Sequence, residues 1–252
     1  MKRITILFLT IITSSIVVLA QDDYVLPETE APVPKTQELK FPNPDFTNYS
    51  FSAAAFTLDK GDAQLLGTDI LFSKISYGIN DRSMISMNAS LFGTFTVSFK
   101  QRIPVNEEFN LAFSACAGNF LFIDKDSIIR LFGGQSLATF GNHQNNVTFG
   151  IGLYFGKSSF EVVDQTKNLF FHHVFVATQR QIRPKTYLVA EGMYYWNYNT
   201  FMGSFAMKFV IKSRMSLHVG IMPLYRNGRI SRNQTRQERG AVPIISYRWL
   251  LH

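Results

Sequence analysis

The chain has little of what disulfide scaffolds, helical membrane proteins and most enzymes are built from. Cys116 is its single cysteine, so an intrachain disulfide is excluded, and a small disulfide-stapled domain with it. Beyond the first twenty residues no stretch approaches about 18 consecutive apolar residues, which argues against membrane-spanning helices. Cys116 is in phase with the small residues Ala112 and Ser114, so we expect it at an inward packing position rather than as a nucleophile.

Motifs for catalysis, metal binding and nucleic-acid binding are equally scarce. No Gly-x-Ser-x-Gly nucleophile elbow occurs, and the five histidines have no spacing that would bring three metal ligands together. Asp124-Lys-Asp126 lacks the continuation that a calcium loop requires. The net charge of +7 is accompanied by no nucleic-acid motif. We therefore predict no catalytic residue, no metal site, no cofactor and no nucleic-acid partner.

What the chain does have at its start is an export signal. Lys2 and Arg3 precede an apolar run, and Val18-Leu19-Ala20 offers a small-residue cleavage site before Gln21. These features predict a signal peptide over residues 1–20, with an uncleaved anchor helix as the alternative. Residues 21–48 then hold five prolines and little apolar periodicity, which predicts an extended periplasmic leader.

Residues 49–252 are dominated by alternation of apolar and small or polar side chains. In residues 200–212, for example, Phe205 and Phe209 alternate with Ser204 and Lys208. A period of two is a strand with two different faces, and about 9–11 such residues cross a bilayer when tilted. We predict an all-β fold, an antiparallel transmembrane β-barrel of about twelve strands in the cell outer membrane. The expected strands are 49–57, 63–79, 83–92, 94–104, 108–119, 128–140, 145–156, 168–180, 186–196, 200–212, 214–225 and 241–251, of which 63–79 and 128–140 alternate poorly.

Most connections between these segments alternate in length, as they do in outer-membrane barrels, although two of the expected long ones, near Gly93 and Tyr198, are short. The short ones are residues 80–82, 105–107, 141–144, 181–185 and 213, and the long ones include 120–127, 157–167 and 226–240. We expect the short turns and both chain ends on the periplasmic side. The last strand carries Tyr247 and Trp249 close to the chain end, the usual form of a signal for the outer-membrane assembly machinery.

Two groups of charged residues are candidate contact sites. The segment 226–239 is rich in arginine, which pairs bidentately with phosphate, so we predict a contact with lipopolysaccharide or another anion through Arg226, Arg229, Arg232, Arg236 and Arg239. A second group falls on candidate lumen faces of the strands, where it would either tune ion passage or pair to close the lumen: Lys74, Lys100, Glu191, Lys208 and Arg248. Charges placed on the lipid face, at Phe149, Phe205 or Phe209, should impair assembly, whereas Thr148 and Ser204 should tolerate them.

The pair His172-His173, with Asp164 and Ser158-Ser159 upstream, is the one constellation that resembles a hydrolase set. Adjacent strand residues point to opposite faces, so only one of the two histidines can face the lumen. A lipid-modifying enzyme therefore remains an alternative reading, but the prediction is that the protein is not an enzyme.

Several short motifs resemble a known group of proteins. They are Asn43-Pro44, the run Tyr49–Asp62, Ser76–Asp81, and Phe140-Gly141-Asn142 leading into Asn146–Gly152, with Leu188–Glu191 further on. Their order resembles a widespread group of uncharacterised outer-membrane β-barrel proteins from Bacteroidota, over about residues 43–252. The resemblance implies a barrel and an outer-membrane location, and it carries over no activity.

These observations leave three readings of function. The first is a passive channel or a structural or accessory component of the outer membrane, with outer-membrane lipid and lipopolysaccharide as partners and a larger outer-membrane complex left open. The second is the lipid-modifying enzyme, and the third a soluble secreted β-barrel that binds a hydrophobic ligand. Outward-facing Phe, Ile, Leu and Met on several strands argue against the third.

Overall fold

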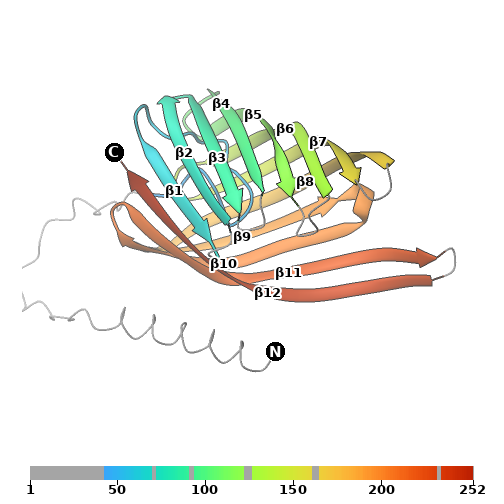
Figure 1. The fold of residues 1–252 in the computed structure, drawn as a ribbon. Helices are drawn as coiled ribbons and strands as arrows, with labels where there is room; N and C mark the ends of the chain where they lie inside the picture. Colours follow the sequence, from blue (N-terminus) through green and yellow to red (C-terminus); the bar gives the residue numbers. More distant parts are fainter. Residues whose placement is uncertain are drawn as a thin grey trace, which may run out of the picture. The chain divides into compact units, whose positions relative to one another are not determined.

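The protein is a closed antiparallel β-barrel of twelve strands, in which each strand pairs with its sequence neighbours and β1 pairs with β12 (Figure 1). The computed structural model describes residues 43–69, 72–90, 94–121, 127–160, 165–231 and 234–251. The strands are β1 (Ala63–Thr68), β2 (Phe72–Asn80), β3 (Ser83–Ser90), β4 (Phe95–Pro104), β5 (Phe109–Leu121), β6 (Ser127–Gly141), β7 (Asn146–Phe160), β8 (Gln165–Arg183), β9 (Thr186–Tyr195), β10 (Thr200–Lys212), β11 (Met215–Ser231) and β12 (Gln234–Leu251). A short 3-10 helix, η1 (Trp196–Tyr198), lies between β9 and β10. The predicted signal peptide and residues 21–42 of the predicted leader lie outside the described residues.

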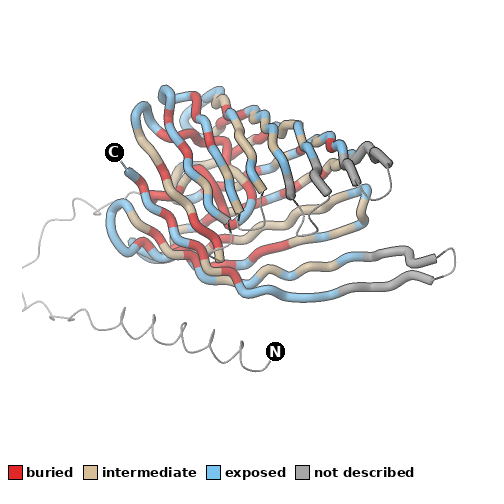
Figure 2. Tube along the Cα trace, in the orientation of Figure 1, coloured by how far each residue is buried: buried red, intermediate tan, exposed pale blue. Residues whose placement is uncertain are grey.

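The outer surface of the barrel is apolar. Along β7, Phe149, Ile151 and Leu153 are each about half exposed, whereas Thr148, directly before Phe149, is fully buried. The same alternation runs along most strands, and Figure 2 shows it as changes between exposed and buried residues along the tube. We call this outer surface the apolar belt; it includes Ile75, Tyr77, Met87, Phe95, Phe99, Phe113, Phe132, Phe140, Phe149, Ile151, Phe155, Phe201, Phe205, Phe209, Ile221, Tyr247 and Trp249. A belt of this extent is far beyond the scattered apolar residues of a soluble surface, so the soluble-barrel reading is not supported.

The interior is the more polar side. Gln64, Ser76, Ser86, Ser246 and His218 are buried there, facing the lumen rather than lipid. This inside-out distribution is the one expected of a barrel whose outer wall contacts hydrocarbon. Among the described residues, no helix is long and apolar enough to cross a membrane.

The barrel has two different ends. At the end that we call the turn end, the strands are joined by tight connections at residues 81–82, 105–108, 142–145, 184–185 and 213–214, and the chain enters and leaves the barrel there. The other connections form what we call the loop end. Here β11 and β12 continue as a two-stranded ribbon past their neighbours, because pairing of β10 with β11 ends at Thr200–Arg226 and pairing of β1 with β12 ends at Thr68–Ser246 (Figure 1).

The count of twelve strands is confirmed, but two of the predicted segments are wrong. Residues 63–79 form two strands rather than one, because the chain reverses after β1. Asp69 adopts a left-handed conformation with φ 51°, and its carboxylate accepts a hydrogen bond of 2.7 Å from the backbone N–H of Ile245. Aspartate is among the few non-glycine residues that tolerate this conformation.

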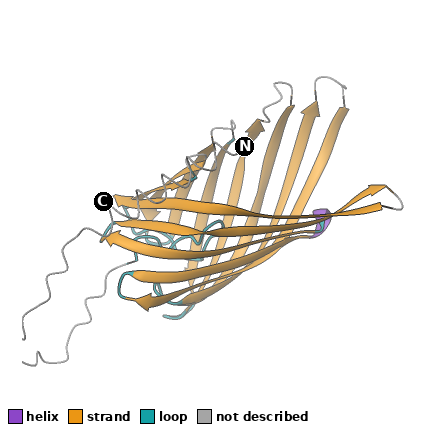
Figure 3. Cartoon of the chain, turned by 90° about the horizontal axis from the view of Figure 1, so that it is seen from below, coloured by secondary structure: helices purple, strands orange, loops and turns teal. Residues whose placement is uncertain are grey.

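The other wrong segment is residues 49–57, which form no strand of the barrel. They belong to a stretch, residues 43–58, that lies inside the lumen; we call it the plug. In Figure 3 this stretch is part of the loop-coloured chain within the ring of strands. Residues 43–48, predicted to be periplasmic leader, are also inside the barrel. Both edges of β1 are already occupied, by β2 and β12, so the barrel offers no free strand edge to which residues 49–57 could pair.

Candidate functional site in the barrel lumen

The plug is a hairpin-like loop that enters at the turn end and returns to it. Asn48 and Ala53 form an isolated antiparallel bridge, and the N–H of Tyr49 donates to the carbonyl of Ser52 over 2.9 Å, so residues 49–52 are the tip of the loop. At its base, Asn43 donates to the carbonyl of His143 in the turn between β6 and β7. The hydroxyl of Thr57 donates to the carbonyl of Asp81 in the turn between β2 and β3.

Asp45 of the plug is the centre of a buried charge cluster. Its Oδ2 is paired with the guanidinium of Arg248 on β12, and lies 3.4 Å from Nζ of Lys208 on β10 and 2.9 Å from Nε2 of His218 on β11. All four side chains are fully buried. Breaking a buried pair of this kind by removing one partner is costly, because it leaves the other charge without water or a counter-ion.

The same cations also bind the backbone of the plug. Arg248 donates to the carbonyls of Asn48 and Tyr49, and Lys208 donates to the carbonyl of Asp45 over 2.7 Å. Lys100 on β4 donates to the carbonyl of Ala54 over 3.0 Å. The lumen side chains thus supply the hydrogen bonds that a strand partner would otherwise give to this segment.

Glu191 on β9 holds the tip of the plug. Its carboxylate accepts hydrogen bonds from the N–H groups of Phe51 and Ser52, at 2.9 and 2.8 Å, and from the hydroxyls of Ser52 and Ser204. Lys74 on β2 donates to the side chain of Asn48 over 2.9 Å. The structure therefore places all five of the lumen charges expected from the sequence inside the barrel, and each of them contacts the plug.

Apolar contacts complete the seat of the plug. Tyr49, Ala54, Ala55 and Phe56 form one buried cluster with inward residues of five strands, among them Leu137 on β6. The Tyr49 hydroxyl donates to Asn146 over 2.5 Å and lies 2.7 Å from the hydroxyl of Thr148. An inward leucine breaks the simple alternation of β6, which is why this strand alternates poorly in the sequence.

His143 packs against the plug at the turn end, outside the strands. Its ring is stacked on Phe46 with centroids 4.1 Å apart and meets Phe56 edge-on at 4.6 Å. Burial lowers the pKa of His143 below its usual value, and the nearby charge of Arg102 lowers this pKa further, while Asp59 acts in the opposite sense. The neutral ring is therefore the form that fits this contact.

The plug separates two cavities. One, of about 700 Å³, lies at the turn end. It is lined by Phe56 of the plug, by Asp59 directly after the plug, and by the turns that contain Asn106 and Asn142. The other, of about 570 Å³, lies between the tip of the plug and the loop end, and we call it the vestibule. Tyr49, Ala54 and Ala55, each almost completely buried, fill the lumen between them.

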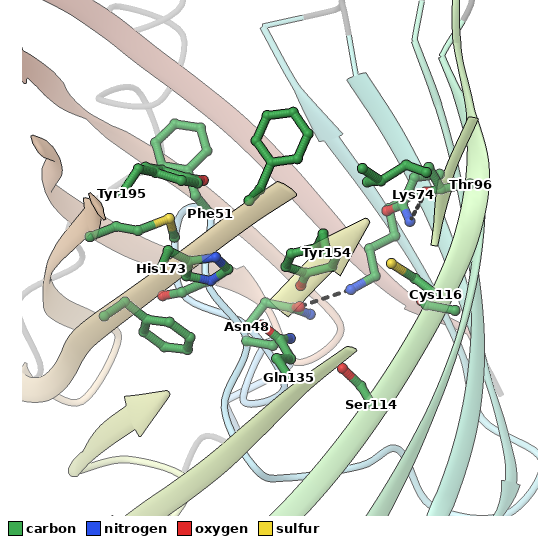
Figure 4. Close-up of a pocket in the computed structure, with 18 residues that line it drawn as sticks. Asn48, Phe51, Lys74, Thr96, Ser114, Cys116, Gln135, Tyr154, His173 and Tyr195 are labelled. Carbon is green, nitrogen blue, oxygen red and sulfur yellow. Dashed lines mark hydrogen bonds between the residues drawn. The ribbon is translucent and has the colours of Figure 1, made fainter. Parts of the chain in front are cut away.

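The vestibule has walls of different chemistry (Figure 4). Aromatic side chains from β7, β8 and β9 form one wall: Tyr154, Phe171, His173, Phe175 and Tyr195. Amide and hydroxyl side chains from β3 to β6 form the other: Asn88, Thr96, Ser98, Ser114 and Gln135. The tip of the plug, with Asn48, Phe51 and Ser52, closes the floor, and Lys74 and Cys116 also line the cavity. Cys116 faces the lumen, as its phase in the sequence predicts.

Of the hydrolase-like set, the structure describes the side chains of the two histidines. His173 faces the lumen and contacts the rings of Tyr154 and Tyr195, whereas His172 contacts Phe170 and Trp196, so the two histidines do take opposite faces as predicted. Asp164 lies outside the described residues. Among the described residues, no group of three or more His, Cys, Asp or Glu side chains could hold a metal ion.

The arginine-rich segment 226–240 is mostly strand rather than loop. It forms the protruding ribbon of β11 and β12. In the backbone register of this ribbon, Arg226 lies opposite Glu238, Arg229 opposite Thr235, and Gly228 opposite Arg236. Arg226 and Arg239 are exposed, and the guanidinium of Arg239 lies 5.5 Å from the ring of Tyr225. Arg232 lies outside the described residues. A contact of this ribbon with anions stays a prediction.

Sequence comparison finds no matching family model and no matching curated protein. Solved structures with a similar fold include the NanC porin, with 9% identity, a TM-score of 0.49, and coverage of 75% of this chain and 98% of the porin. The KdgM porin in complex with disordered oligogalacturonate has 9% identity, a TM-score of 0.43 and coverage of 76% and 98%. The outer membrane protein Omp33 of Acinetobacter baumannii has 9% identity, a TM-score of 0.36 and coverage of 75% and 95%. At these values the likeness concerns the barrel fold alone.

Proposed function

We propose that this protein is an outer-membrane β-barrel channel that its own N-terminal segment holds closed. The membrane assignment is supported by the apolar belt and the polar lumen, and by the predicted export signal. The observation that carries the closed state is the plug, because five lumen charges and a buried apolar cluster bind it across the barrel interior. The role is non-catalytic, and the resemblance noted above supports a source in the Bacteroidota.

Planar bilayer recording tests this function directly. The native barrel should conduct little, whereas a variant with a loosened plug should open to a stable, larger conductance. Asp45→Asn is the variant of choice because it removes the anion at the centre of the buried cluster. Asp59→Asn, which changes an exposed acid just beyond the plug, is the matched control. If neither the native protein nor the Asp45 variant conducts, the barrel is a structural or accessory component instead.

The turn end faces the periplasm in this proposal. The short connections and both ends of the barrel chain lie there, which is the arrangement of outer-membrane barrels. In a Cys116→Ser background, a cysteine at Thr235 of the ribbon should react with a membrane-impermeant reagent on whole cells. Reaction only after the outer membrane is opened would show the opposite orientation.

The ribbon of β11 and β12 then projects at the cell surface, and the five arginines of the sequence segment 226–239 would contact lipopolysaccharide phosphates. Such contacts are screened beyond about 8–10 Å at physiological salt, so they require close approach of the headgroups. Replacing the five arginines with glutamine should reduce the lipopolysaccharide that stays bound in native mass spectra while leaving the barrel folded. Unchanged retention would leave the ribbon without this role.

A further inference from the structure

We propose that the vestibule is a binding site for a small hydroxyl-rich ring compound, a mono- or disaccharide, held between its aromatic and its polar wall. The inference deepens the proposed channel function by naming the class of solute. It rests on that function only in treating the bound sugar as a solute that the channel transports. The cavity itself, of about 570 Å³, falls in the size range of small-molecule sites, roughly 300–1,000 Å³.

Neighbouring rings of the aromatic wall lie nearly parallel to one another. Tyr154 and His173 lie nearly parallel, at 6° with centroids 5.6 Å apart, and His173 and Phe175 are tilted by only 26°. A cluster of aromatic rings of this kind offers apolar contact to the C–H face of a sugar ring.

Glycines on β7 make this wall possible. A Cβ atom placed at Gly152 would collide with the ring of His173, and one placed at Gly150 would collide with the ring of Phe175. Each glycine is paired directly with the aromatic residue that covers it. The rings can therefore lie against the backbone of β7 instead of projecting across the cavity, and this leaves the vestibule open.

The polar wall decides between a sugar and a purely apolar ligand. Gln135 and Ser98 carry groups that can both donate and accept hydrogen bonds, and these are what the hydroxyls of a sugar require. The amide of Asn88 donates to the hydroxyl of Thr96 over 2.9 Å, and its carbonyl oxygen is a further acceptor in this wall. A fatty acid or an aromatic hydrocarbon would cover these groups and leave them unpaired, at a cost for each. Of the described residues that line the cavity, none is acidic, and Lys74 is the one cation, so a carboxylate on the sugar is also accommodated.

Cys116 provides a native reporter for the test, since it is the single cysteine of the chain and lines the vestibule. Full-length mature protein in detergent is alkylated with N-ethylmaleimide, with and without methyl glucoside, maltose or glucuronate, and binding is checked by saturation-transfer NMR. We expect at least one sugar to slow alkylation severalfold, whereas benzoate and decanoate leave it unchanged. Protection by benzoate or decanoate but by no sugar overturns the proposal, and so does the absence of any protection.

Two variants separate the walls from general effects on folding. Tyr154→Leu should weaken sugar binding about tenfold through loss of stacking, and Asn88→Leu should weaken it by loss of hydrogen bonds. Phe155→Leu, which removes the next ring on the outer face of the same strand, is the matched control and should bind as the native protein does. Equal binding by all three variants overturns the assignment of the walls.

The ligand's charge is resolved by Lys74→Met. Tighter binding of glucuronate than of methyl glucoside, lost in this variant, assigns the ammonium to a sugar carboxylate, whereas equal binding assigns the site to the neutral ring. Binding is measured without conductance, so the two proposals fail separately. If the barrel conducts but binds no sugar, the sugar site is disproved and the channel function stands. If the barrel binds sugar but never conducts, the channel function is disproved and the sugar site stands.

Discussion

The two halves of the lumen use the same strands for opposite purposes. At the turn end several inward side chains are charged, and every one of the buried cations near Asp45 binds the plug. At the loop end the inward side chains are neutral apart from Lys74, and they leave a cavity of about 570 Å³ between an aromatic and a polar wall. The difference shows that closure and solute contact depend largely on different residues, which meet where Lys74 and the plug residues Asn48, Phe51 and Ser52 line the vestibule.

The largest expected effect is release of the plug by Asp45→Asn. With the plug seated, this change would leave Arg248 and Lys208 buried without their counter-ion, a penalty of about 3–5 kcal/mol. When the plug leaves, water can solvate both cations, so the barrel should stay folded while the plug undocks. Hydrogen exchange should show lost protection of residues 43–58 and retained protection of the strands. Loss of protection throughout would mean that the plug is required for the barrel itself.

Charged substitutions should have different effects on three surfaces of the barrel wall: the apolar belt, the positions that contact the plug or its partners, and the vestibule. Phe149→Lys and Phe205→Lys put a charge into the apolar belt, at about 2–4 kcal/mol near the membrane midplane, and should impair assembly. The expectation that Thr148 and Ser204 tolerate a charge requires correction, because both are buried, Thr148 against Tyr49 of the plug and Ser204 against Glu191. Ser98→Lys, in the vestibule, is the lumen position that should assemble normally. Heat-modifiable gel mobility measures assembly, and equal yields at Ser98 and Phe149 would contradict the assigned facing.

Glu191→Gln should loosen only the tip of the plug. The carboxylate accepts four hydrogen bonds from Phe51, Ser52 and Ser204, and an amide can replace only some of them, at an expected cost of about 1–3 kcal/mol. We expect more frequent brief openings in bilayer recordings rather than a permanently open state. The tip forms the floor of the vestibule, so Cys116 should also be alkylated faster. If Cys116 reactivity is unchanged while the openings increase, the two halves are more independent than we infer.

The smallest expected effect is a pH dependence of plug docking through His143. Its pKa is depressed by burial, so as pH falls below the ordinary histidine value the undocked state takes up a proton that the docked state resists. Docking should therefore be strongest at neutral pH and weaken on acidification. His143→Phe keeps a ring against Phe46 and removes the proton, so its openings should vary less between pH 7.5 and pH 5. An identical pH profile in this variant would assign the dependence to other groups.

Much of the barrel could be predicted because side-chain alternation reports directly on which face meets lipid. The outward positions of β7, β10 and β12 follow from their sequences alone, and so do the short turns. The predicted count of twelve strands agrees with the structure because two errors cancel: the prediction counts residues 49–57 of the plug as a strand, and it merges β1 and β2 into one. Both errors lie before β3, so they do not change the end of the barrel that is predicted for each later connection.

The plug could not be recognised by the same rule. Tyr49, Phe51 and Ala53 alternate as a strand would, yet the backbone of the plug is satisfied by side chains far away in sequence, such as Glu191 and Arg248. Periodicity carries no information about such partners. The motifs that carry the family resemblance do fall on the plug and on residues that contact it, including Asp81, Asn146 and Glu191. The role of Asp45 gave no sequence signal, because it lies in a Pro-rich acidic segment.

The seam between the first and last strands is short, since six residue pairs join β1 to β12. The plug spans this seam from inside: Gln64 on β1 contacts Thr47 and Asn48, while Arg248 on β12 pairs with Asp45. β12 follows the plug and β1 along the chain, so its arginine is synthesised after them. Ring closure in the membrane can thus be completed against a template that the nascent chain carries with it. A chain that lacked the plug would have to close the barrel through these six residue pairs alone.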